Sequence, residues 1–124
     1  MKLSELVERY CFHDSYLKSV HFDSFKKTLT ISIHFCNWMQ SYYQASMEES
    51  LLINLIFSNI KYFECNSPEK YDWHYTMDDI TSISDSSYGD GVKIALIHDN
   101  TGEMDFIRIF AQDVAFVDLG VDED

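Results

Sequence analysis

Histidine and cysteine residues at two-residue spacing are the first side chains in this chain that could do chemistry. Cys11 with His13, and His34 with Cys36, each offer two ligands to a zinc ion. A structural zinc site needs four ligands in a tetrahedral arrangement, and the expected hairpin register does not assemble one because His34 faces Leu17. We therefore expect no metal site. We also expect Cys36 to be a small buried apolar residue rather than a nucleophile.

Carboxylate pairs are the second possible source of chemistry, but a chain with 21 acidic residues contains many of them. Asp78 with Asp79, and Asp85 with Asp90, could bind calcium. Residues 85–91 lack the alternating oxygen ligands and the final Glu of an EF-hand loop, which favours a solvated acidic loop. The chain also has no glycine-rich phosphate loop, no nucleophile elbow and no dinucleotide fingerprint. The sequence therefore predicts no catalytic residue, no cofactor and no enzymatic activity.

The net charge of −12 belongs to one half of the chain. Residues 1–63 hold six acids and six bases, whereas residues 64–124 hold fifteen acids and only Lys70, Lys93 and Arg108 as bases. Such a field repels nucleic acid and anionic lipid surfaces, and it attracts basic proteins. We therefore expect a basic protein partner, and neither nucleic acid nor membrane.

Large aromatic residues gather in two connections outside the predicted strands. The first connection carries Trp38, Tyr42 and Tyr43, and the second carries Tyr71, Trp73 and Tyr75. One interpretation is that the connections fold back and bury these rings. The other is a recognition surface, because Tyr and Trp dominate the binding energy of many interfaces. On that second interpretation the partner-binding residues are Trp38, Tyr42, Tyr43, Asp72, Trp73, Tyr75, Asp78, Asp79, Asp85 and Asp90.

Periodicity predicts the elements that must position these residues. Leu3, Leu6, Val7 and Tyr10 recur at helical spacing near the start of the chain, so we expect a short helix with this face against a sheet. Residues 28–36 alternate strictly between apolar and polar side chains, which is typical of a half-buried strand. With residues 16–22 they form a predicted hairpin, in which Phe22 lies opposite Leu29, Val20 opposite Ile31 and Tyr16 opposite Phe35.

The remaining strands follow the same rules. A central strand is expected over residues 49–58, with 60–63 continuing it past a bulge; further strands are expected over 80–84, 92–98, 103–110 and 114–117. Residues 92–98 and 103–110 form a second hairpin around Gly102. The expected fold is α+β and mainly β, with a short N-terminal helix packed on an antiparallel sheet of about six or seven strands, in a single domain over residues 1–124.

The composition also suggests where the protein works. The longest apolar stretch, residues 51–57, is interrupted by Asn54 and is far shorter than a membrane span, which needs about 20 residues. The start of the chain lacks the apolar stretch of a signal peptide. Three widely spaced cysteines do not form a disulfide framework and are expected to be reduced thiols. We therefore expect a cytoplasmic protein.

Four stretches carry a resemblance: FHDSYL at residues 12–17, LTISI at 29–33, FSNI at 57–60 and AQDV at 111–114. In this order they resemble the small β-rich bacterial domains that include immunity proteins of polymorphic toxin systems. The resemblance implies a protein that neutralises a cognate toxin, often a nuclease with a basic active-site face. It transfers no functional residue to this chain.

The leading interpretation is a non-catalytic immunity or antitoxin-like inhibitor that occludes a basic, nuclease-like toxin with an acidic and aromatic surface. The first alternative is a structural or assembly module of a bacterial complex, which would self-associate as a homo-oligomer. The second alternative is a small-ligand or carbohydrate-binding domain, in which loop rings stack on a sugar and acids orient its hydroxyls.

Overall fold

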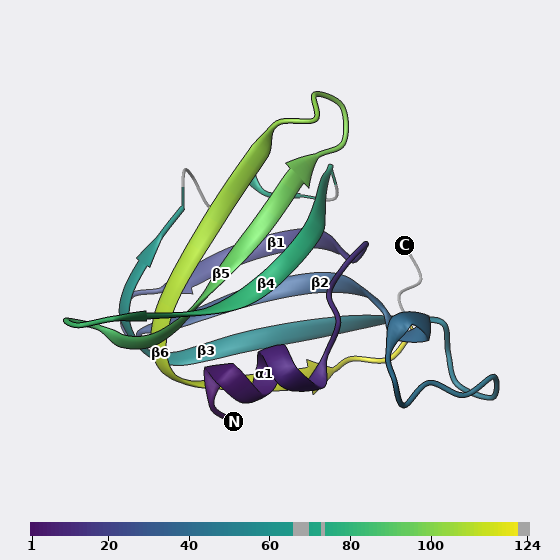
Figure 1. The fold of residues 1–124 in the computed structure, drawn as a ribbon, viewed down its shortest axis with the longest axis horizontal. Helices are drawn as coiled ribbons and strands as arrows, with labels where there is room; N and C mark the ends of the chain where they lie inside the picture. The colour runs from purple at the N-terminus through teal and green to yellow at the C-terminus, as the bar shows by residue number, and fades with distance from the viewer. Residues whose placement is uncertain (66–69, 73, 122–124) are drawn as a thin grey trace.

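One short helix and six antiparallel strands make up the computed structural model, which describes residues 1–65, 70–72 and 74–121 (Figure 1). In chain order the elements are α1 (Leu3–Arg9), β1 (Tyr16–Asp23), β2 (Thr28–Cys36), the 3-10 turn η1 (Asn37–Met39), β3 (Ser50–Glu64), β4 (Tyr75–Asp85), β5 (Gly89–His98) and β6 (Met104–Asp118). The predicted mainly β fold with an N-terminal helix is confirmed.

The strands form a closed antiparallel barrel in the order β1-β2-β3-β6-β5-β4. β3 pairs with β2 through its first half and with β6 along most of its length, while β5 pairs only with the first half of β6. Figure 1 shows the result, with β4 and β5 crossing over β1, β2 and β3. The closing contact between β4 and β1 is a single residue pair, Tyr16 with Thr76.

The alternation predicted for β2 is confirmed by burial. Its four apolar residues, Leu29, Ile31, Ile33 and Phe35, are all fully buried in the barrel. Burying one such side chain stabilises a fold by roughly 1.5–3 kcal/mol, so this face is a main contributor to the core. From α1, Leu3 and Leu6 join the same core, and the helix contacts β4, β5 and β6.

The predicted register of the first hairpin is correct at its turn and wrong at its far end. Phe22 lies opposite Leu29 and Val20 opposite Ile31, as expected. A bulge between Leu17 and Ser19 then inserts one extra residue into β1, so that Tyr16 lies opposite His34 instead of Phe35. The two rings stack with centroids 4.4 Å apart.

Two strand predictions require correction. The weak strand expected over residues 80–84 is the eleven-residue β4, which begins at Tyr75, so the prediction that Tyr75 lies in a connection is wrong. A bulge at Asp78 separates the buried Tyr75 and Met77 from the buried Ile80 and hides the alternation. The separate final strand expected over residues 114–117 is instead the second half of β6.

Candidate functional site

The two aromatic clusters have opposite environments. Trp38 and Tyr42 are 51% and 43% exposed, and Tyr43 is half-buried. In the second cluster, Tyr71 and Tyr75 are buried, with ring centroids 5.3 Å apart. The described rings of the second cluster are therefore buried, as the first interpretation expects, whereas two rings of the first cluster remain exposed. Tyr75 is not available as a partner anchor because its ring belongs to the core, and Trp73 lies outside the described residues.

Four of the predicted acids are engaged within the chain, and one of them is Asp79, whose carboxylate accepts a hydrogen bond from the Ile80 amide (2.9 Å). Asp72 accepts a hydrogen bond from the His74 amide (2.9 Å), which lowers the pKa of its carboxyl group. Asp78 lies 3.9 Å from the imidazole of His13. Asp85 accepts hydrogen bonds from the amides of Ser87 (2.7 Å) and Tyr88 (3.1 Å) and so shapes the turn between β4 and β5.

The structure does not gather the predicted residues on one patch. Asp72 precedes β4 and Asp85 ends it, so roughly 33 Å of strand separates them at about 3.3 Å per residue. Asp79 and Asp90 are exposed on β4 and β5, whereas Trp38 and Tyr42 belong to η1 and the loop after it. Figure 1 shows that loop at the opposite end of the molecule from the β4–β5 turn.

An open hollow of about 380 Å³ lies beside η1, and Tyr42 is on its wall. Its floor is aromatic: Tyr10 stacks on Phe116 at 4.1 Å, and Phe35 meets Phe116 edge-on at 5.3 Å. The complete lining comprises Tyr10, Asn37, Tyr42, Met47, Glu48, Leu51, Phe116 and Asp118. Residues from the N-terminal segment, the η1 region and the end of β6 therefore meet at one site.

Hydrogen bonds hold the walls of this hollow in place. The Tyr42 hydroxyl donates to Asn37 Oδ1 (2.8 Å), and Asn37 Nδ2 donates to the Glu48 carbonyl (2.8 Å). Gln40 is buried and donates through Nε2 to the carbonyls of Cys11 (2.7 Å) and Cys36 (3.0 Å). The loop is thus fixed both to itself and to the N-terminal segment.

The charge of the hollow is negative. Among the described residues that line it, Glu48 and Asp118 are the only ones with ordinarily charged side chains, and none is Lys or Arg. Burial raises the pKa of the Tyr42 hydroxyl, and the negative charge of Asp118 raises it further. Tyr42 therefore stays neutral at physiological pH.

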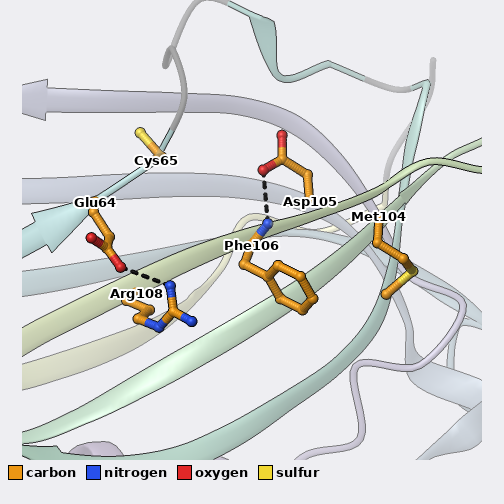
Figure 2. A pocket seen from close by; sticks show the side chains of 6 residues that line it. All are labelled: Glu64, Cys65, Met104, Asp105, Phe106 and Arg108. Carbon is orange, nitrogen blue, oxygen red and sulfur yellow. Dashed lines mark hydrogen bonds and ion pairs between the residues drawn. The ribbon is translucent and has the colours of Figure 1, made fainter.

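A second hollow, shown in Figure 2, has a different charge balance. Arg108 pairs there with Glu64 (2.7 Å), and Lys70 pairs with Asp105 (3.1 Å). Lys93 lies over the ring of Phe106, 4.3 Å from its centroid. All three bases of residues 64–124 are thus placed in this region. Glu64 and Asp105 of this second hollow are each paired with a base. Among the described residues that line the hollow beside η1, no Lys or Arg accompanies Glu48 and Asp118.

Exposed apolar side chains lie on the chain segments that adjoin the hollow beside η1. Trp38 is joined to the start of β3 by its amide, which donates to the Glu49 carbonyl (3.1 Å). The segment after β6 returns to the same place, since Leu119 donates to the carbonyl of Leu52 (2.9 Å). We call seven exposed residues of η1, the loop after it and residues 118–121 the η1 surface; four of them line the hollow (Tyr42, Met47, Glu48 and Asp118), and three lie on the adjoining segments (Trp38, Leu119 and Val121).

Sequence reasoning identified Trp38 and Tyr42 but missed the rest of the η1 surface. Met47 and Glu48 are close to them in sequence, and their place in the same long connection was the available signal. Asp118 and Leu119 reach the site only because β6 pairs with β3, which no local pattern indicates.

The site offers little for metal or covalent chemistry. Within residues 1–65, 70–72 and 74–121, no group of three or more His, Cys, Asp or Glu side chains is placed to hold a metal ion. Burial raises the pKa of the Cys36 thiol, whose Sγ donates to the Asp14 carbonyl (3.4 Å). A protonated, buried thiol is a poor nucleophile.

Comparison with known proteins adds no assignment. In the part of the chain that the structure describes, no helix is long and apolar enough to cross a membrane. No protein-family model matches the sequence, and a search of curated proteins finds no match.

Proposed function

We propose that this chain is a non-catalytic binding protein that recognises a basic protein partner through the η1 surface. The observation that carries the proposal is the hollow whose aromatic floor lies beside Glu48 and Asp118 with no cation in its lining. A Lys or Arg side chain suits such a site, because its apolar stem packs on rings while its charged end meets carboxylates. Trp38 and Tyr42 supply the exposed aromatic area typical of binding anchors.

We further propose that the partner is a basic, nuclease-like toxin and that the protein is an immunity or antitoxin-like inhibitor acting in the cytoplasm. Two observations support this: the resemblance to immunity proteins, and the net charge of −12. All three cysteines are free thiols, which is typical of a reducing compartment. Inhibition would follow from occlusion, with Glu48 and Asp118 occupying the positive site where the toxin binds phosphate.

The test uses a basic toxin domain encoded beside this chain. Its affinity and association rate are measured by surface plasmon resonance for the natural protein and for Trp38→Ala and Glu48→Gln. We expect Trp38→Ala to weaken binding about tenfold or more, as loss of an aromatic anchor does. Glu48→Gln should chiefly slow association, and added salt should slow it further by screening.

Phe25→Ala is the matched control, because Phe25 is 99% exposed in the β1–β2 turn, outside the η1 surface. It should leave the affinity unchanged. The proposal is wrong if the neighbouring toxin does not bind. It is also wrong if the toxin binds with an affinity that neither added salt nor the substitutions Trp38→Ala and Glu48→Gln change.

An assembly module is the second function that a specific observation favours. Trp38, Leu119 and Val121 are each about half exposed, and such apolar area also suits self-association. Charge opposes self-association through this surface, because Glu48 and Asp118 of one copy would approach the same acids of the other copy. Sedimentation of the isolated protein decides between the two: a stable homo-oligomer that Trp38→Ala dissociates supports the module, and a monomer supports the inhibitor.

A further inference from the structure

One edge of β4 is open over its second half. Its other edge pairs with β5 from Tyr75 to Asp85. On the open side, β4 meets β1 only at Thr76, and the Met77 backbone bonds with Asp14 and Ser15. Among the residues that the structure describes, no strand pairs with this side of β4 over residues 79–85, and no loop makes a backbone hydrogen bond to it there.

This open edge is accessible and held in shape. Thr81, Ser82, Ser84 and Asp85 are all exposed, so α1 does not cover this part of the strand. The turn that follows is fixed by the Asp85 carboxylate and by the ring of Tyr88, which stacks on Tyr62 with centroids 4.8 Å apart. An edge strand that is already ordered loses little conformational freedom when another strand joins it.

The charges on this edge favour one kind of occupant. Asp79 and Asp85 lie on the same face of β4, because their pairing with β5 runs without a bulge from one to the other. If two copies paired antiparallel about Ser82, Asp79 of each would lie opposite Asp85 of the other, which like-charge repulsion disfavours. An incoming strand with basic residues at these two positions would form opposite-charge pairs instead.

We propose that residues 79–85 of β4 bind an extended, basic segment of a protein partner, which adds a seventh strand to the sheet. The segment carries Lys or Arg at two positions six residues apart, about 20 Å along a strand, to meet Asp79 and Asp85. Between them, Thr81 and Ile83 present β-branched side chains on the same face, which favour strand pairing. Lys93 does not oppose this, because its ammonium group lies over Phe106 of β6, on the other side of β5.

The probe is a terminally blocked heptapeptide, KTVTVTK, added to the ¹⁵N-labelled protein and followed by NMR and hydrogen exchange. We expect the amide signals of residues 79–85 to shift and their exchange to slow. A peptide of equal charge with prolines at its third and fourth positions should not bind, because neighbouring residues of a strand direct their N–H groups to opposite sides and one of the two prolines must therefore remove a pairing donor.

Three variants separate edge recognition from general charge attraction. Asp79→Asn and Asp85→Asn should each weaken peptide binding several-fold while keeping the oxygen atoms that accept local hydrogen bonds. Asp90→Asn removes the same charge from β5 and should leave the affinity unchanged. Equal weakening by all three variants, binding of the proline peptide, or signal shifts confined to the η1 surface would overturn the proposal. Glu48→Gln should not alter peptide binding, so the η1 surface is tested separately.

Discussion

At the scale of single residues, the cysteines show how environment decides reactivity. Cys36 is 7% exposed, and burial raises the pKa of its thiol, whereas Cys11 is exposed. Because the thiolate is the reactive form, we expect iodoacetamide at neutral pH to alkylate Cys11 in the folded protein and to leave Cys36 unmodified. Peptide mass spectrometry checks this, with unfolded protein as the control in which both react. Equal labelling rates in the folded state would contradict the structure.

His13 is the residue whose titration the structure constrains most directly. Its Nδ1 donates to the Asp78 carbonyl (2.8 Å), and this bond, followed by the nearby charge of Asp14, raises the pKa of the imidazole above 6.5. A raised pKa means that the protonated form favours the folded state. The stabilisation that protonated His13 gives the fold is therefore fully present below the pKa of His13 in the unfolded chain. It is lost as the pH rises through the pKa of His13 in the folded protein.

We expect Asp14→Asn to bring the pKa of His13 closer to its ordinary value while leaving it raised, since the bond to Asp78 remains. Asn tolerates the left-handed backbone at this position, where φ is 66°, so the variant should fold. An NMR titration of the His13 ring measures the change, and Glu48→Gln provides a distant control. An unchanged pKa in Asp14→Asn would show that the Asp14 charge does not act on the ring.

At the scale of elements, β2 supplies a main part of the core and packs Phe35 against Phe116, which lines the hollow beside η1. Phe35 is fully buried and contacts the rings of Phe12 (5.4 Å) and Phe116 (5.3 Å). We expect Phe35→Ala to lower the free energy of unfolding by about 3–5 kcal/mol, measured by urea denaturation. Phe25→Ala, at a fully exposed ring, should change it by less than about 0.5 kcal/mol. Similar losses in both variants would contradict the burial of β2.

The elements also show which patterns in the sequence were informative. β2 was predictable because its alternation is strict and one face is fully buried. β4 was hard to recognise because a bulge at Asp78 places two acids between its buried residues. Tyr16 was assigned the wrong partner for the same reason, since the bulge in β1 leaves no signal in composition.

At the scale of the whole molecule, the acidic half of the sequence does not become one acidic face. Lys70 and Arg108 pair with acids around the hollow of Figure 2, and Lys93 lies over Phe106 there. Three other acids, Asp79, Asp85 and Asp90, belong to β4 and β5, and Asp118 lies at the η1 surface. The sequence could predict the total charge and two of the exposed rings. It could not predict which acids, bases and rings lie near one another, because that depends on pairing between residues far apart in the chain.

The single closing pair of the barrel, Tyr16 with Thr76, has a consequence for folding. Sixty positions separate these residues, so joining them carries a loop-closure cost that one residue pair and the two backbone bonds of Met77 with Asp14 and Ser15 must offset. Such a contact is expected to form late and to open first. When this pair and the two backbone bonds of Met77 with Asp14 and Ser15 open together, the accessible edge of β4 would extend back from residue 79 to its beginning at Tyr75. Local unfolding would then lengthen the edge available to an incoming strand.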